Sequence, residues 1–255
     1  MCIKPMIMDK EKLFIEFLKD CDAKEQICGA GNHNSNILLV GNEHYSDTTI
    51  DDWKKYLKNN YDYCEKTKSW SNFNKSKTWL YYQRLIDAAI PNRLKPTVRG
   101  ERNFEEDAFT TELNSEAKRS SRVKGKEERE ELRKRIESRL ELFKQSDFIK
   151  SFPVVVLACG GYLTNSVEKG ITQINDTFGV EFDEQLNREG VPIGWHKSEN
   201  GKLWFTTHHS KDRHKLVIHT WQFSLRCTKR EDREWLINEM ASVIRDHLDH
   251  LKNLD

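Results

Sequence analysis

The chain has 255 residues, 33% of them charged, and a formal net charge of +1. This length is enough for one large domain with a sizeable core, and the balanced charge neither indicates nor excludes a polyanionic partner. Six cysteines without a CxxC pair argue against a zinc or iron–sulfur site and against a disulfide-rich class. No signal peptide and no apolar run of roughly 20 residues are present, which predicts a soluble, cytoplasmic protein without a membrane span.

The apolar spacing predicts helices and strands that alternate along the chain. Asp9 is the expected cap of a first helix over residues 9–21, and the apolar run at residues 36–41 predicts a buried strand. Further helices are predicted over residues 48–60, 76–90, 125–147, about 163–174 and about 230–251. Further strands are predicted over residues 107–113, 151–161, 202–207 and 215–220.

This alternation is typical of an α/β fold, a three-layer α/β/α sandwich with a mostly parallel central sheet and helices on both faces. We expect a single domain over residues 1–255, with the core of the fold at about residues 36–250. The helix over residues 9–21 is expected to pack on the outside of the sheet.

Three polar segments follow the predicted strands, and in such sheets ligands bind outside the carboxyl ends of the strands. The segments are GNEHYSD (residues 41–47), LNS (113–115) and HTWQFS (219–224). Together they would supply a carboxylate, amides, an imidazole and aromatic rings, a set that can perform acid–base chemistry on a flat heterocycle. Each also has a plain structural interpretation, as a solvated carboxylate, a hydrogen-bonded strand-end histidine, a turn-forming asparagine or core aromatics.

In this order, the segments resemble the motifs of the uracil-DNA glycosylase superfamily, which have the forms GQDPYH, a leucine–asparagine pair and HPSPLS. GNEHYS shares the glycine, a side-chain amide, an acid and the tyrosine, and HTWQFS shares the first histidine and the last serine. The prolines of both outer motifs are replaced, by His44, Thr220 and Gln222. The resemblance covers roughly residues 36–250 as an order of elements.

The resemblance implies two catalytic residues. Glu43 would activate water and stabilise the cation that develops on the sugar, and His219 would stabilise the departing base. Asn114 would read the edge of the base, because one amide offers both a donor and an acceptor. The other implied substrate contacts are Asn42, Tyr45 against a 5-methyl group, and Phe73 or Trp70 stacked on the base.

The resemblance also implies DNA as the partner. Phe223 stands where the family carries an apolar wedge that enters the base stack. Five basic residues and no acid lie in residues 117–126, a composition that suits phosphate contacts, although a solvated loop is the alternative. The implied DNA contacts are Phe223, Ser224, Arg226, Lys118, Arg119 and Arg122, and Lys229 and Arg230 add to the charge after the last motif.

The sequence therefore predicts a divergent DNA glycosylase, acting as a monomer without metal or cofactor on uracil or another deaminated base. A second hypothesis is an inactive or repurposed protein of the same fold that binds nucleic acid or a nucleotide. A third is a metal-dependent hydrolase that uses His208, His209, His214 and His219.

Overall fold

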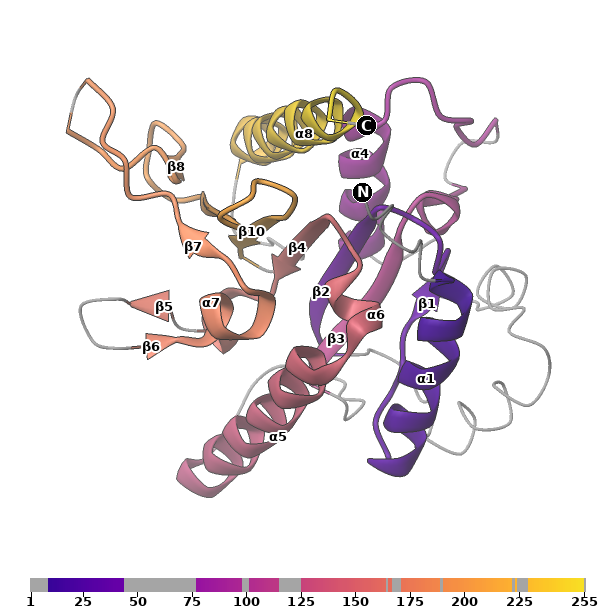
Figure 1. Ribbon diagram of the computed structural model, residues 1–255. Helices are drawn as coiled ribbons and strands as arrows, with labels where there is room; N and C mark the ends of the chain where they lie inside the picture. The colour runs from indigo at the N-terminus through magenta and orange to yellow at the C-terminus, as the bar shows by residue number, and fades with distance from the viewer. Residues whose placement is uncertain are drawn as a thin grey trace, which may run out of the picture.

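A computed structural model describes residues 9–43, 77–97, 101–114, 125–163, 165–166, 171–188, 190–221, 223 and 229–254. Within these residues an eight-stranded sheet has the order β1-β3-β2-β4-β10-β9-β7, with β8 also paired to β9 (Figure 1). The central strands are parallel: β3 (Phe109–Asn114), β2 (Ile37–Glu43), β4 (Val154–Ala158) and β10 (Leu216–Thr220). The flanking strands are antiparallel to their neighbours: β1 (Ala30–Gly31), β9 (Trp204–His209), β7 (Glu181–Phe182) and β8 (Trp195–Lys197).

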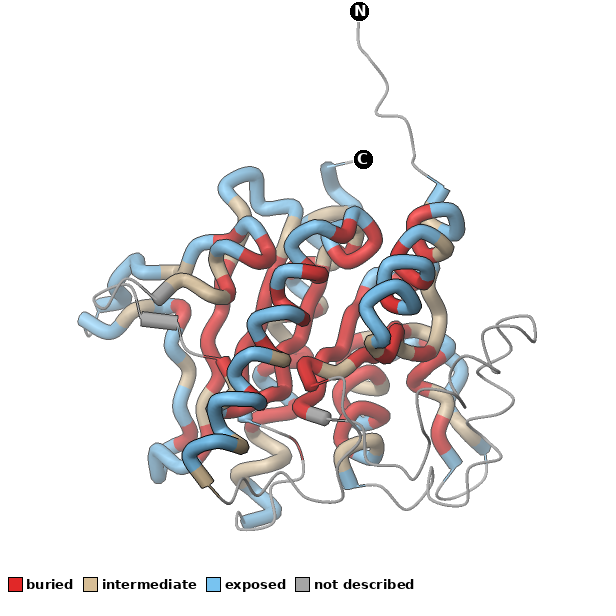
Figure 2. Tube along the Cα trace, turned by 90° about the horizontal axis from the view of Figure 1, so that it is seen from below, coloured by how far each residue is buried: buried red, intermediate tan, exposed pale blue. Residues whose placement is uncertain are grey.

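Helices cover both faces of this sheet. One face, which we call the α5 face, carries α1 (Lys10–Ala23), α5 (Lys126–Gln145), α6 (Asp147–Lys150) and α7 (Gln173–Phe178). The opposite α8 face carries α4 (Lys77–Ala89) and α8 (Arg230–Lys252), which lie side by side. The helices of the α5 face turn their exposed sides outward and their buried sides to the strands (Figure 2). The molecule is thus a mixed α/β fold built in three layers.

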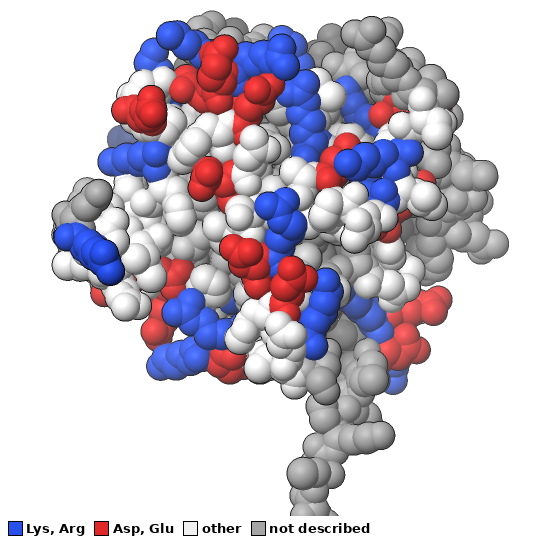
Figure 3. Space-filling view, turned by 90° about the horizontal axis from the view of Figure 1, so that it is seen from above, with Lys and Arg blue, Asp and Glu red and all other residues white. Residues whose placement is uncertain are grey.

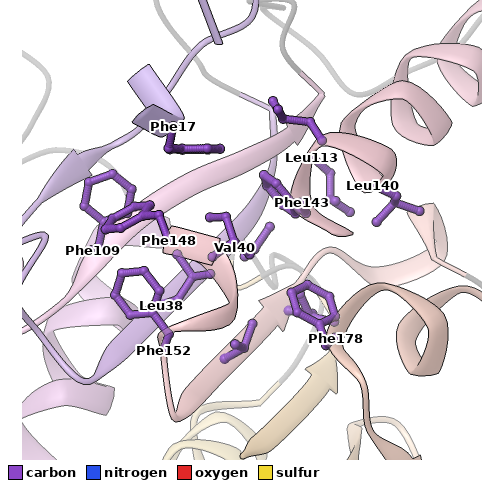
Figure 4. Packing of buried hydrophobic residues seen from close by; sticks show 14 of the residues in the cluster. Phe17, Leu38, Val40, Phe109, Leu113, Leu140, Phe143, Phe148, Phe152 and Phe178 are labelled. Atoms are coloured by element: carbon purple, nitrogen blue, oxygen red, sulfur yellow. The ribbon is translucent and has the colours of Figure 1, made fainter. Parts of the chain in front are cut away.

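Alternation along β2 explains why both layers form. Leu38 and Val40 point into the core of the α5 face, whereas Ile37 and Leu39 point into the core of the α8 face. All four are completely buried, and burial of one such side chain contributes about 1.5–3 kcal/mol. The core of the α5 face is rich in phenylalanines that pack edge to face (Figure 4), and the ring centres of Phe148 and Phe152 are 5.0 Å apart.

A buried arginine joins α5 to the sheet. The Arg139 guanidinium donates to the carbonyl oxygens of Glu112 (3.1 Å) and Ile27 (2.5 Å) and to the Thr111 hydroxyl (2.7 Å). It also lies 4.7 Å from the ring centre of Phe143. These bonds supply the acceptors that a buried guanidinium requires, and they fix the register of α5 against β3.

Most predicted elements that fall on described residues are confirmed, with ends shifted by a few residues. Asp9 caps α1 as expected, since its side chain accepts a hydrogen bond from the Glu11 amide. The predicted helix over residues 163–174 is wrong. The described part of that stretch contains the short strands β5 (Asn165–Ser166) and β6 (Ile171–Thr172), and α7 begins only at Gln173. The β-branched Ile171 and Thr172 favour strand over helix.

The strands β1, β7 and β8 were not predicted, because each has only two or three residues and lacks a periodic pattern. The predicted helix over residues 48–60 lies outside the described residues. In the part of the chain that the structure describes, no helix is long and apolar enough to span a membrane.

Candidate functional site at the carboxyl edge of the sheet

The ends of β2 and β3 bring two of the predicted site residues together. Glu43 is directly opposite Asn114 in the parallel ladder, and the Asn114 side chain is completely buried. The neighbouring Asn42 is also buried, and its side-chain oxygen accepts no hydrogen bond from any residue in the described ranges. A buried amide oxygen in this condition costs free energy unless a ligand, a water or another group pairs with it. The Glu43 side chain, Tyr45, Phe73 and Trp70 lie outside what the structure describes.

A carboxylate that the sequence interpretation missed lies beside this pair. Glu112 precedes Asn114 by two residues on β3, so both side chains point to the α8 face. The Glu112 carboxylate lies directly over Gly41, where an added Cβ would come within 2.1 Å of its oxygen. Gly41 is therefore required for this close approach. The sequence did contain a signal for Glu112. Side chains alternate between the two faces of a strand, so a charged residue two positions before Asn114 points to the same face.

His219 is buried near the end of β10, the next strand but one from β2. Its Nε2 lies 3.1 Å from the Gly160 carbonyl oxygen, which can only accept, so Nε2 carries a proton and donates. Burial lowers the pKa of His219 to about 4, so the ring is neutral near pH 7 and Nδ1 is an acceptor. The neutral ring is suited to hydrogen bonding with a base and unsuited to carrying a fixed positive charge.

A row of tryptophans extends from His219 to the outer strands. The Trp204 ring meets His219 edge to face with ring centres 5.2 Å apart, and it is stacked on Trp195 at 5.5 Å. Trp221, which directly follows β10, meets Trp204 at 5.7 Å. Trp195 and Trp221 are 36% and 41% exposed, so both rings present aromatic surface beside Trp204. Trp195 and Trp204 were missed because β8 was not predicted.

The two parts of the site share an edge of the sheet and point to different faces. His219 lies on the α5 face with Val217, whereas Glu112 and Asn114 lie on the α8 face. Position 219 is level with Val40 across β4, so its backbone is roughly 14 Å from position 43, from two strand spacings and three residue rises. A ligand that contacts both parts must therefore lie across the strand ends.

Phe223 corrects one prediction. Its ring is fully buried in the core of the α8 face and meets Tyr82 edge to face, with ring centres 5.4 Å apart. A wedge that enters a base stack must project from the surface, so this position packs the core instead. An apolar residue after a strand end is compatible with both roles, and the sequence alone gave no means to choose.

The predicted phosphate contacts have little described structure. Ser224, Arg226, Lys118, Arg119 and Arg122 lie outside the described residues. Lys229 and Arg230 are the next two basic residues after Arg226. Arg230 forms an exposed ion pair with Glu234 at 2.6 Å, one turn along α8. Figure 3 shows the side of the molecule seen from above the view of Figure 1. On that side Lys and Arg are interspersed with Asp and Glu among the described residues, which therefore form no continuous basic surface there.

The four histidines of the metal-hydrolase hypothesis do not come together. His208 and His209 are neighbours on β9 and so point to opposite faces, where His209 bonds Asp183 at 2.7 Å. His214 lies in the turn before β10 (Leu216–Thr220), and His219 lies near the far end of that strand. Within the ranges described above, no group of three or more metal-ligating side chains is found.

Neither the protein-family models nor the curated proteins that were compared with the chain contain a match to it. Function must therefore be argued from the residues of the site itself.

Proposed function

We propose that this protein binds a nucleobase across the carboxyl ends of its parallel strands and hydrolyses the N-glycosidic bond of uracil or another deaminated base in DNA. The observation that carries the proposal is the register of Glu43 against Asn114. It puts a carboxylate position and a buried amide at adjacent strand ends. Asn42, the residue before Glu43 but on the α5 face, has a side-chain oxygen that accepts no hydrogen bond from the described residues. We also propose that the fold is that of the uracil-DNA glycosylases.

In the proposed reaction, each kind of side chain at the site has one role. Water attacks the sugar carbon as the bond to the base breaks, and a carboxylate stabilises the developing positive charge and takes the water proton. The base leaves with the bonding electron pair as an anion, which takes up a proton from solvent. Glu43 is the first candidate for that carboxylate, and Glu112, on the same face as Asn114, is the second. Asn114 would pair with the base edge. Trp221 and Trp204 follow or lie on strands three and four spacings away, roughly 14 and 19 Å, so they would stack on a neighbouring base of the same nucleic-acid strand, which is worth about 1–3 kcal/mol per ring.

His219 favours a second candidate function, binding without cleavage. Its Nε2 proton already bonds the Gly160 carbonyl, so donation to a departing base requires that this bond be exchanged. The core position of Phe223 likewise removes the expected wedge. A protein that recognises a base in single-stranded nucleic acid, with no chemical step, needs neither group.

Base release from uracil-containing DNA separates the two functions. Single-stranded and double-stranded substrates are incubated with the wild type, Glu43→Ala, Glu112→Gln and His219→Ala, with the exposed Glu184→Ala as the control. The enzyme proposal predicts release by the wild type and the control, and a rate about 100-fold lower in the variant that lacks the working carboxylate. Binding without release would support the second candidate. Equal release by all variants would indicate a contaminant and contradict the enzyme proposal.

A further inference from the structure

Three lysines lie close together at the opposite edge of the sheet, near the amino ends of β2, β4 and β10. They are Lys10, Lys150 and Lys215. The Lys215 ammonium donates to the carbonyl oxygens of Lys150 (2.7 Å) and Phe152 (2.8 Å). The Lys10 ammonium donates to the Ser35 carbonyl and lies 4.0 Å from the ring centre of Phe152. Both lysines therefore approach Phe152, from different elements.

A cavity of about 320 Å³ opens beside this cluster. It lies between the segment that joins α6 to β4, the end of α7 and the turn from β9 to β10. Its walls include Lys150, Phe152, Phe178, Asp212, His214 and Lys215. The volume is at the lower end of the range for small-molecule sites. Phe152 and Phe178 are buried in the core beneath it, so the polar residues of the wall form the surface that a ligand can reach.

Two of the three lysines near this cavity keep a positive charge that no described carboxylate pairs with. Neither Lys10 nor Lys215 forms an ion pair with a described carboxylate, whereas Lys150 pairs with Asp147 at 3.2 Å. Burial lowers the pKa of Lys215 to about 8, and the charges of Lys10 and Lys150 add to that effect. Burial also lowers the pKa of Lys10 to about 8. A bound anion would relieve this repulsion, which no described side chain relieves.

The acidic residue of the cavity is already engaged. One Asp212 carboxylate oxygen accepts from the Ser210 hydroxyl (2.5 Å) and from the His214 amide (3.1 Å). These bonds shape the turn between β9 and β10 and hold Asp212 away from a bond with either buried lysine. Lys215 uses two of its three N–H groups on carbonyl oxygens, so one donor remains for a ligand.

We propose that this cavity binds a small anion, a phosphate or a carboxylate. The anionic oxygens would accept from Lys215. A purely structural role, in which Lys215 only satisfies the carbonyl oxygens after α6, would not need the cavity or the second buried lysine. This site is independent of the base-binding edge.

Calorimetric titration of the full chain with inorganic phosphate, phenyl phosphate and benzoate tests the proposal. Saturable binding is expected, with similar affinity for inorganic phosphate and phenyl phosphate, and at least tenfold weaker in Lys215→Met. Lys202→Met removes an exposed lysine and is expected to bind as the wild type does. Benzoate binding as tight as that of phenyl phosphate would identify a carboxylate site, and weaker benzoate binding a phosphate site.

A second measurement uses only the wild type, in case Lys215→Met fails to fold. Amine acylation at pH 8, read by mass spectrometry, is expected to modify Lys215 and to be slowed there by phenyl phosphate, with Lys202 unaffected. No saturable binding, or equal protection of both lysines, would overturn the proposal.

Discussion

Replacing Phe223 with alanine separates a core role from a wedge role. The side chain is completely buried in the core of the α8 face, and it meets the ring of the equally buried Tyr82 on α4. Truncation of a buried phenylalanine leaves a cavity and costs about 3–5 kcal/mol, whereas loss of an exposed surface side chain costs about 0.5 kcal/mol or less. We therefore expect Phe223→Ala to lower the free energy of unfolding by about 3–5 kcal/mol.

Urea unfolding followed by circular dichroism measures this change, provided that the slope of the transition stays the same. Trp221→Ala is the matched control, since it removes an aromatic residue two positions earlier that is 41% exposed. Its expected cost is about 1 kcal/mol, from the edge-to-face contact with Trp204. A Phe223→Ala protein of unchanged stability that binds DNA more weakly would refute the core assignment and restore the wedge.

Three further predictions concern stability and the geometry of the site. Arg139→Met is expected to cost about 3 kcal/mol or more in urea unfolding, because the carbonyl oxygens of Glu112 and Ile27 lose their donor; an unchanged midpoint would argue against these bonds. Burial lowers the pKa of His208 and of His219 to about 4, below the ordinary 6.5, so the unfolded chain binds their protons first as the pH falls. Their contribution to the free energy of unfolding is complete above pH 6.5 and is lost from pH 6.5 towards 4, by up to about 3 kcal/mol per histidine. A urea midpoint that is constant over that range would contradict this. Gly41→Ala is expected to displace the Glu112 carboxylate and to lower base release or base binding as Glu112→Gln does; full activity in Gly41→Ala would show that this close approach is not needed.

The long elements could be predicted from the sequence because their patterns are strong. The run of Val154 to Ala158 is apolar throughout and is buried on both faces, and α8 keeps its apolar positions on one side over 23 residues. The pairing order of the strands is a property of long-range contacts, and no local pattern specified it. The two-residue and three-residue strands at the edges are held by β3 or β9, so their own residues carried little signal.

The candidate site could be predicted only in part. Strand ends located Asn42, Asn114 and His219 at one edge, and the structure places all three there in buried positions. The face to which each side chain points depends on strand phase, which the sequence interpretation did not work out for Glu112. The tryptophan row depends on β8, whose position beside β9 brings Trp195 onto Trp204.

Tryptophan fluorescence gives the most direct test of the central claim that a base binds across the strand ends. A single-stranded oligonucleotide with one uracil is titrated into the wild type and into Asn114→Ala, at the same low salt concentration. The account predicts a saturable change in the total tryptophan emission, to which Trp204 and Trp221 contribute, and at least tenfold weaker binding by the variant. No saturable change in the wild type, or equal affinity of a correctly folded Asn114→Ala protein, would contradict it.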